Sequence, residues 1–512
     1  MKAMKLLYRI SNGMVYAISF VILAILTIKN LIFSTYVMNI KEHIRIRNTN
    51  VWMTAVFMIG LVLLFYLLFK FSERIDEKKL FLFFSDEKKL FLFFSVIYLV
   101  AGIYMIININ SVLRYDALSV HKASIAIHHG KFTTMDMGHY MYRYPHQIGF
   151  LIYEYILGFI SHDAKLLFGM NLAAIFGINF FIYKITKEIF NDQHKVNLTA
   201  ITLSFLFLPQ FFFLTFAYGL IPGFFLLTVG VFYLFAAVRT KKWKDMILSS
   251  IFLMLAVLMK KNFIIALAAC LCYLFLHYLK EHDKNILKMM VLFVIVFVAG
   301  KMIMTVGFEV ATGKKINKGV PSILWVAMGT DPDNHVRSGG WYNKKFIDVY
   351  VSNNYDREKA AKQGEKMVSG YIKQYKRHPK KACEFFSKKL TTTWTDPLYE
   401  SIFSGPKAAA GQYVKTKQLH HLFNEEKHDT YLYTGMKAYI ILLLAAVWIF
   451  VIKYLKEYDK AAFGLIFLTG GFLFHLFWET KGQYVYPYIF MQIPTAAYAV
   501  TRFYEKISAK AK

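Results

Sequence analysis

Long apolar runs separated by short polar stretches are the dominant pattern of this chain. A helix that crosses a bilayer needs about 20 consecutive apolar residues. The pattern therefore predicts a mostly α-helical, polytopic membrane protein with about 12 transmembrane helices. The runs that we expect to span the membrane are 12–37, 51–71, 90–109, 164–185, 197–217, 220–238, 245–260, 262–280, 287–306, 433–453, 461–478 and 484–502.

Two polar stretches interrupt this pattern. The longer one, 307–431, mixes acidic, basic and aromatic residues without repetition, so we expect a folded soluble domain rather than a linker. The shorter one, 110–147, leads into an apolar run at 148–160 that is too short for an untilted span. We expect this run to form a juxtamembrane or re-entrant helix.

Composition supports the same class. Hydrophobic residues make up 57% of the chain and charged residues 18%, with a mean hydropathy of +0.40. Soluble globular proteins have about 45–50% apolar and about 25% charged residues, so a soluble protein is excluded. Disorder, collagen and coiled coil are excluded by the same figures. Of the three cysteines only Cys383 lies in a polar region, so we expect no intramolecular disulfide in an exported domain.

The net charge of +29 is concentrated in short loops beside the apolar runs. The loops at 239–245, 280–288 and 453–460 and the C-terminal tail are basic, which places them in the cytoplasm by the positive-inside rule. Alternation of spans then places 110–147 and 307–431 outside and both termini inside. The stretch 41–47 is an exception to the positive-inside rule, because it is basic although the alternation of spans places it outside. Membrane lipids are expected as partners and nucleic acid is not, since no nucleic-acid-binding motif occurs.

The N-terminus has no cleavage site after its first apolar run, so we expect an uncleaved anchor. The sequence DEKKLFLFFS occurs twice, at 76–85 and at 86–95, and a single duplication predicts no repeat architecture.

The order of the apolar and polar stretches divides the chain into five segments. They are a three-span N-terminal part (1–109), an outer loop with juxtamembrane helices (110–160), a transmembrane core (161–306), an extracytoplasmic soluble domain (307–431) and a three-span C-terminal part (432–512).

Asp116 follows the third apolar run by a few residues, at the expected outer surface of the membrane. Residues 117–129 have helical spacing, and Gly130 is suited to end that helix in the left-handed conformation. Further along, Pro145 restricts the residue before it to extended geometry. A carboxylate in this place can accept a proton from a hydroxyl while Arg143 or a lysine holds a lipid-linked phosphate. The alternative is that Asp116 only caps the following helix.

A second polar group, Lys260, Lys261 and Asn262, separates two apolar runs on the same outer face. Paired ammonium groups at this depth are costly unless they meet anions, so we expect them to contact phosphate. The alternative is a plain loop that contacts phospholipid headgroups. Near the C-terminus, His475 and Glu479 are four residues apart and would share one helical face that points inward. They are equally well interpreted as interfacial residues beside an aromatic belt.

Three further positions carry weaker hypotheses. Glu154 is an ionisable residue inside the short apolar run, which makes it a functional candidate. Trp341 and Tyr342 stand in a Gly-Gly-Trp-Tyr-Asn sequence that we expect to form a turn, as we do for 325–329, and to bring aromatic rings to a cleft suited to sugars. The acidic sequence at 331–334 lacks the remaining ligand spacing of a calcium loop, so no metal site is predicted. Standard hydrolase, metalloprotease, nucleotide-binding and C-x-x-C motifs do not occur in the sequence.

With these residues considered together, the chain resembles the GT-C superfamily of polytopic glycosyltransferases. The likeness is to glycosyltransferase family 39, which includes the protein mannosyltransferases and the lipid A aminoarabinose transferase. Asp116 in RYDALSVHKA matches the family's acidic residue after an early span, and YRYPHQIG at 142–149 matches a proline motif before the next helix. MKKN at 259–262 is similar to a lysine-containing outer turn. The resemblance covers roughly residues 90–502, and Arg143 replaces the first lysine of the usual K-P-P motif.

The resemblance implies transfer of a sugar from a polyprenyl-phosphate donor to a hydroxyl, with inversion, on the outer face of a bacterial cell membrane. Asp116 is then the catalytic general base, and Arg143, Lys260 and Lys261 bind the donor phosphate. The implied acceptor is an envelope polysaccharide, teichoic acid or glycolipid. No cofactor is expected, and a metal-free mechanism is favoured over one with a divalent metal. The substrate contacts expected are Tyr144, His146, Gln147, Asn262, Trp341, Tyr342, Glu479 and Tyr484.

Two other functions stay open at this point. A transporter or flippase of lipid-linked oligosaccharides would also be polytopic, but transporters tend to have inverted repeats and broken helices at mid-membrane. Neither feature is visible in this sequence. A polysaccharide polymerase or ligase would differ by using an oligosaccharide diphosphate as its donor.

Overall fold

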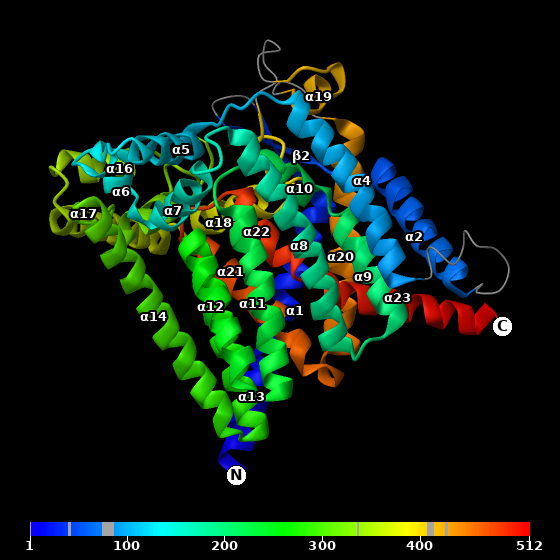
Figure 1. Ribbon diagram of the computed structural model, residues 1–512. Helices are drawn as coiled ribbons and strands as arrows, with labels where there is room; N and C mark the ends of the chain where they lie inside the picture. Colours follow the sequence, from blue (N-terminus) through cyan, green and yellow to red (C-terminus); the bar gives the residue numbers. More distant parts are fainter. Residues whose placement is uncertain are drawn as a thin grey trace.

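A computed structural model describes residues 2–38, 42–73, 86–334, 337–406, 414–424 and 429–511. These residues are mostly helical, and the long helices form one bundle that runs from top to bottom of Figure 1. Most of the other helices gather at the end of the bundle opposite the N-terminus (Figure 1). The helices of the bundle are α1 (Lys2–Ile32), α2 (Val51–Glu73), α4 (Glu87–Asn108), α8 (Ala164–Phe190), α9 (His194–Leu206), α11 (Leu220–Thr240), α12 (Trp243–Met259), α13 (Ile264–Glu281), α14 (Lys284–Thr312), α20 (Thr430–Lys453), α21 (Ala462–Phe477) and α23 (Ile493–Ala511).

The remaining elements connect these helices or cover the end of the bundle opposite the N-terminus, which is called the outer end below. The strands β1 (Phe33–Met38) and β2 (His43–Asn48) pair in antiparallel fashion between α1 and α2. The other helices are α5 (Tyr115–His128), η1 (Thr133–Met135), α6 (Tyr140–Arg143), η2 (Pro145–Gln147), α7 (Ile148–Gly158), α10 (Leu208–Phe212), η3 (Phe213–Thr215), η4 (Lys261–Phe263), α15 (Ser322–Thr330), α16 (Lys345–Ser352), α17 (Arg357–Arg377), α18 (Pro379–Trp394), α19 (Lys417–Leu422), η6 (Leu455–Glu457), η7 (Asp459–Ala461) and α22 (Gly482–Phe490).

Among the described residues, nine helices are long and apolar enough to cross a membrane, and a bent pair formed by α9 and the segment Leu208–Thr215 raises the number to ten if it is one span. The mostly α-helical, polytopic class expected from the sequence is therefore confirmed. α12 is shorter, with 17 residues, and the last apolar run is divided between α22 and α23. Pro487 and Pro494 flank that division, and proline does not continue a regular helix. The total of 12 spans stays a prediction.

Several long helices expose apolar side chains along most of their length. α14 is the clearest case, because only 11% of an apolar stretch of 18 residues within it is buried. The corresponding shares for α2 and α4 are 17% and 22%. Exposed residues of α14 include Val298, Met302 and Ile303. Continuous apolar surface of this kind is unstable in water and stable against lipid. These faces are those of a membrane protein.

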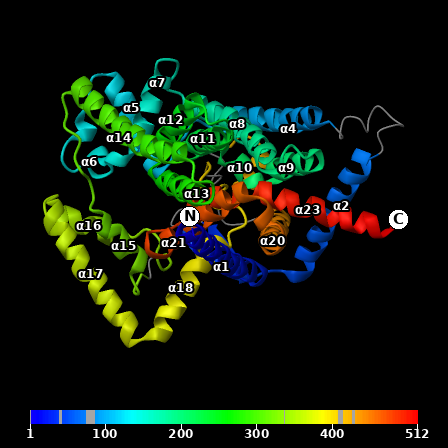
Figure 2. The ribbon, with the colours of Figure 1, turned by 90° about the horizontal axis from the view of Figure 1, so that it is seen from below.

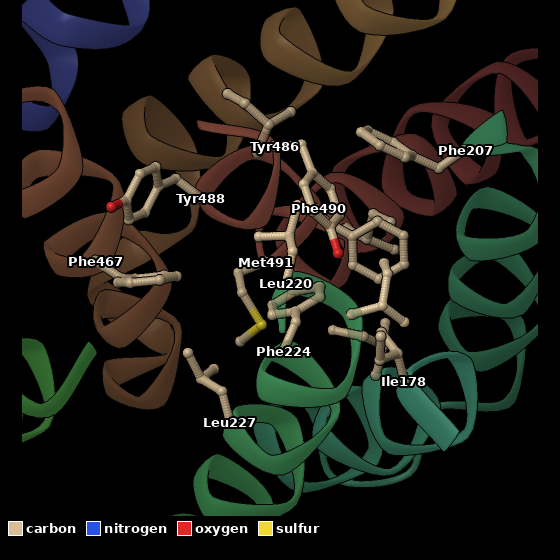
Figure 3. Packing of buried hydrophobic residues seen from close by; sticks show 14 of the residues in the cluster. Ile178, Phe207, Leu220, Phe224, Leu227, Phe467, Tyr486, Tyr488, Phe490 and Met491 are labelled. Carbon is tan, nitrogen blue, oxygen red and sulfur yellow. The ribbon is translucent and has the colours of Figure 1, made fainter. Parts of the chain in front are cut away.

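The central core lies where α22 enters the bundle. Aromatic and aliphatic side chains from α8, α11, α21 and α22 interdigitate there, as Figure 3 shows for Ile178, Phe224, Phe467 and Phe490. Phe207 separates α9 from α10 and stacks edge-on against Phe490, with ring centroids 5.1 Å apart. The breaks in the two irregular spans therefore meet on packed rings, and a buried glutamine lies beside each break: Gln210 donates to Asn179, and Gln492 donates to the carbonyls of Gly464 and Tyr488.

The two polar stretches lie together at one end of the bundle (Figures 1 and 2). α15, α16 and α17 enclose a small hydrophobic cluster of their own, which includes Leu324, Phe346 and Tyr350. This cluster is continuous with the outer loop, because the Val320 amide donates to the Arg143 carbonyl over 3.1 Å. Lys314 also pairs with Asp136 at 2.6 Å. α7 has 11 residues, which is shorter than a membrane span, and lies at this end as well.

A buried lysine joins the polar helices to the bundle. Lys389 of α18 is 1% exposed, and its ammonium group donates to three carbonyls: Gly329 at 2.6 Å, Leu476 at 2.9 Å and Trp478 at 2.8 Å. These carbonyls belong to the C-terminal ends of α15 and α21, where helix-end carbonyls have no partner within the helix. A lysine at this position satisfies three acceptors at once and also meets the negative end of two helix dipoles. The contact fixes the position of the residues that follow α21.

We predict that Lys389→Met destabilises the protein by about 3 kcal/mol, because three buried carbonyls lose the ammonium donor that they share. The measurement is the unfolding midpoint of purified protein in detergent, followed by tryptophan fluorescence. Lys388→Met is the matched control, since the neighbouring Lys388 is exposed and its loss should change stability by less than about 0.5 kcal/mol. Equal midpoints for the two variants would contradict the role of Lys389.

Candidate functional site

Asp116 is the second residue of α5 and is exposed. α5 lies at the outer end of the bundle (Figure 1). The helix starts at Tyr115, its N-cap residue is Arg114, and no side chain caps it. The interpretation of Asp116 as a capping residue is therefore wrong. Tyr115 has a φ of 47°, a conformation that side chains other than glycine rarely adopt and that is frequent at functional sites. α5 ends at His128 with Gly130 in the left-handed region, as predicted.

Lys260 lies in the turn that follows α12, and 7% of its surface is exposed. Its ammonium nitrogen is 3.8 Å from the centre of the Tyr218 ring and 5.9 Å from that of Tyr484. Burial lowers the pKa of Lys260 to about 7, although the carboxylates of Asp116 and Glu479 both act to raise it. Asp116 and Lys260 are thus electrostatic neighbours, with the carboxylate on the exposed side and the ammonium on the buried side.

Arg143 and Asp116 act on the same pair of phenols. Tyr144 and Tyr342 share a hydrogen bond between their hydroxyl groups, and burial raises the pKa of each. The Asp116 carboxylate adds to both increases, and the Arg143 guanidinium opposes both. Arg143 also lies over the Tyr144 ring, at 5.6 Å from its centre. Tyrosine side chains connect Arg143 to Lys260, because the Tyr144 ring packs against that of Tyr140, whose hydroxyl is 3.1 Å from that of Tyr218. Asp116 acts electrostatically on the same tyrosines and on Lys260.

Glu479 lies on the other side of Lys260, in the connection between α21 and α22. It is 4% exposed, and burial raises the pKa of its carboxyl to about 7 against the opposing charges of Lys481, Lys389 and Lys260. α21 ends at Phe477, so Glu479 does not share a helical face with His475, and that part of the prediction is wrong. Both side chains are nevertheless buried, as the inward orientation predicted and unlike interfacial residues. Its position depends instead on the Lys389 contact to the carbonyl of Trp478.

Lys481 extends the charged cluster to a third region of the chain. Its ammonium group pairs with Glu42 at 2.7 Å, and the second carboxylate oxygen of Glu42 is 2.6 Å from Nε of Arg337. Glu42 directly precedes β2, whereas Arg337 lies between α15 and α16. The cluster therefore draws its charges from segments that are far apart in the sequence.

Glu400 completes the cluster from the segment after α18. It is 2% exposed, its carboxylate accepts a hydrogen bond from the Gly482 amide, and burial raises its pKa to about 8. Tyr399 and Glu400 are consecutive residues with positive φ, at 50° and 60°. Two such conformations in a row are strained, and Asp396 stabilises the turn by accepting from the amides of Leu398 and Glu400.

The other predicted contacts fall into two groups. Gln147 donates to the Tyr218 hydroxyl at 2.6 Å, Tyr484 lies within reach of Lys260, and Tyr342 is held by Tyr144, so these three lie in the cluster. His146 is half-buried beside it, and burial together with the charges of Lys261 and Lys260 lowers its pKa to about 3. Neutral imidazole at this position can accept or donate a hydrogen bond.

The remaining predicted residues point elsewhere. Lys261 is exposed, and the charges that act on it are those of Lys301 and Arg357 rather than Asp116. Asn262 lies beside it in η4 and is half-buried. Trp341 is 0% exposed, and its indole donates to Thr392 at 3.2 Å. A ring buried in this way has no face open to a sugar. Residues 325–329 lie within α15 and do not form the expected turn.

Glu154 is not part of the cluster around Asp116. Its carboxylate pairs with Nδ1 of His121 at 2.9 Å, and Nε2 of His121 lies 3.1 Å from the His162 carbonyl. The pair joins α7 to α5, the helix that carries Asp116. α7 in turn approaches the end of α12 so closely that a Cβ atom on Gly149 would lie 2.0 Å from the Leu258 carbonyl oxygen. The His121–Glu154 pair therefore helps to position Asp116 relative to Lys260.

Sequence reasoning did not select Glu42, Arg337, Lys481 or Glu400. The only signal available for Glu42 was its place in the one basic loop, 41–47, that contradicted the charge rule. Lys481 stood in the turn from which Glu479 and Tyr484 were selected. Among the residues that the structure describes, no group of three or more histidine, cysteine, aspartate or glutamate side chains is arranged to hold a metal ion.

Comparisons with protein-family models and with curated proteins found no match for this chain. The geometry of the cluster is therefore the basis for any functional conclusion.

We predict that contact between α5 and α7 weakens as the pH rises above about 6.5. Burial lowers the pKa of His121, but the hydrogen bond and charge of Glu154 outweigh burial and leave it raised above 6.5. Burial also raises the pKa of Glu154. Groups whose pKa is higher in the folded state stabilise it below their unfolded pKa and lose this contribution as the pH rises through the folded value.

The measurement is hydrogen exchange of α5 amides at pH 6 and pH 8, corrected for the intrinsic pH dependence of exchange. His121→Gln should abolish the difference in protection, whereas His129→Gln should retain it because His129 is exposed. An unchanged pH dependence in His121→Gln would show that other groups, such as His128 or His162, are responsible.

Proposed function

We propose that this protein is a membrane glycosyltransferase that moves a sugar from a polyprenyl-phosphate donor to a hydroxyl of a cell-envelope acceptor. The observation that carries the proposal is the convergence of Asp116, Arg143 and Lys260 at the outer end of a bundle of apolar helices. A carboxylate open to water beside a buried ammonium suits a reaction between a water-facing acceptor and a lipid-linked phosphate. The same residues match the motifs of the GT-C resemblance.

In the proposed reaction, Asp116 takes the proton of the acceptor hydroxyl as its oxygen bonds to the anomeric carbon. The bond between that carbon and the carrier phosphate breaks in the same step, and the phosphate leaves with the electron pair. Lys260 and Arg143 stabilise the negative charge that develops on the leaving phosphate. Attack from the side opposite the phosphate inverts the configuration at the anomeric carbon.

Burial makes Lys260 effective in this role. An ion pair in a poorly hydrated site is several-fold stronger than the same pair in water, because the effective dielectric constant is lower. A bound phosphate would keep Lys260 protonated, as Asp116 and Glu479 already tend to do. The Tyr218 ring, 3.8 Å below the ammonium, holds it in place through a cation–π contact worth about 2 kcal/mol when desolvated.

The topology belongs to the same proposal. We propose 12 spans in a bacterial cell membrane, with both termini in the cytoplasm and 110–147 and 307–431 outside. The grouping of both polar stretches at one end of the bundle supports this arrangement (Figure 1). α12 and the divided run at 484–502 would be the spans beyond the ten counted by length and composition.

A transporter or flippase of lipid-linked oligosaccharides is the second candidate, because α9 and α10 form a span bent by 47°. Broken helices in transporters usually present polar groups to a substrate at the midplane. Here Phe207, at the break, packs against Phe490 of α22 (Figure 3), and the nearby buried Gln210 donates to Asn179 at 2.9 Å. The amide group of Gln210 is therefore already bonded within the protein, which favours the enzyme.

We predict that Asp116→Asn lowers the rate of transfer by about 100-fold or more, since amide cannot accept the proton. The measurement is acceptor-dependent release of polyprenyl phosphate by purified protein. Asp136→Asn is the matched control, because Asp136 lies in the same loop and pairs with exposed Lys314. Full activity in Asp116→Asn would refute the general base, and movement of intact donor across a bilayer without turnover would favour the transporter.

We predict that Cys383 reacts with a membrane-impermeant maleimide in intact cells. Cys383 is exposed on α18, whereas Cys270 and Cys272 lie in the apolar helix α13. The natural cysteine therefore reports the side of 307–431 without an added tag. Cys383→Ser should abolish labelling. Reaction only after the membrane is permeabilised would place this region in the cytoplasm and refute the proposed orientation.

A further inference from the structure

Glu42 is the only carboxylate in contact with both Arg337 and Lys481 among the described residues. Each of its two oxygens meets one cation, at 2.6 Å and 2.7 Å, and the residue is 8% exposed. The guanidinium of Arg114 also acts electrostatically on the Glu42 carboxyl. Three cations from three distant segments therefore surround one carboxylate.

Other contacts hold the two arginines independently of Glu42. Arg114 donates to the carbonyls of Phe403 and Gly405, at 2.8 Å and 3.0 Å. Arg337 donates to the Tyr342 carbonyl at 2.6 Å, and its guanidinium is 5.3 Å from the centre of the Tyr342 ring. A set of cations positioned in advance is an arrangement that binds oxyanions, because arginine and lysine donors converge on the oxygens.

The segment that supplies Glu42 is weakly anchored. Glu42 has a φ of 53°, which is unfavourable for a residue with a Cβ atom. β2, which follows directly, has five exposed residues out of six, and a hairpin of two strands has little stability of its own. The contacts of β1 are firmer, since the Thr35 hydroxyl bonds to Thr395 at 2.8 Å. The ion pairs thus hold Glu42 in a strained backbone conformation.

We propose that Arg337 and Lys481 form an oxyanion site, which the Glu42 carboxylate fills in this structure and a phosphate or carboxylate group of the acceptor fills when substrate is bound. The site lies two residues from Glu479 and adjoins the Asp116–Lys260 cluster through it. Arg337 belongs to the region that covers the outer end of the bundle, which is where a water-facing acceptor would approach. Its assignment to the acceptor rests on the proposed function, whereas the existence of the site does not.

The test uses the full-length protein in detergent and inorganic phosphate as the probe. Glu42→Gln keeps the shape of the side chain and removes its charge, so Arg337 and Lys481 lose the carboxylate that pairs with both, and Glu400 and Glu479 remain near Lys481. We expect a lower melting temperature than wild type, and a recovery of about 3 °C or more in millimolar phosphate. Wild type should show no comparable shift, because Glu42 occupies the site. Sodium chloride at equal ionic strength should not restore the variant.

Two controls separate this site from a general effect of charge. Glu42→Gln combined with Lys481→Gln or with Arg337→Gln should lose the response to phosphate. Asp348→Asn also breaks an ion pair, but its partner Lys344 is 76% exposed and should bind phosphate no better than the surface does. An equal response to phosphate and chloride in Glu42→Gln, or no response, would overturn the site.

A last comparison identifies the source of the oxyanion. Glycerol phosphate and dodecyl phosphate carry similar headgroups, but only the second resembles a lipid carrier. Equal stabilisation of Glu42→Gln by both supports an acceptor group, and a clear preference for dodecyl phosphate would overturn the acceptor assignment. These readouts do not depend on catalysis. A phosphate response together with an active Asp116→Asn variant would therefore retain the site and reject the proposed reaction.

Discussion

Buried ammonium groups that bind main-chain carbonyls hold the outer end of this protein together. Lys389 joins the ends of α15 and α21 through three carbonyls. Lys437 of α20 donates to the carbonyls of Phe33 and Thr395 and to the side-chain oxygen of Asn30. An ammonium group removed from water must satisfy all of its donors, and three convergent acceptors do so. Each lysine therefore imposes one arrangement on the helix ends around it.

This constraint places the residues of the candidate site. The carbonyl of Trp478 is bound by Lys389, so the next residues, which include Glu479 and Lys481, leave α21 in one direction. Lys437 holds the Thr395 carbonyl, and the strained turn at Tyr399 and Glu400 follows within a few residues. The charged cluster is consequently built on fixed helix ends, which suits a site that must hold its charges in a set geometry.

Much of the fold and part of the site could be predicted from local sequence. Apolar runs indicated the long helices, and Gly130 indicated the end of α5. Asp116, Lys260 and Glu479 were selected because each is a charged residue at the end of an apolar run. Trp341 and Glu154 show the limit of this reasoning, since an aromatic or ionisable residue in a promising motif can equally be part of the core or of a separate pair.

The sequence by itself determined the membrane class, the positions of the helices and the charged residues at their ends. These features depend on hydrophobicity and turn preference over some 20 neighbouring residues, and such patterns are visible in a linear chain. Only the tertiary structure decided which charges meet. Lys481 and Glu42 are 439 residues apart, and their pairing depends on the packing of α1, α18, α20 and α21, which no local pattern encodes.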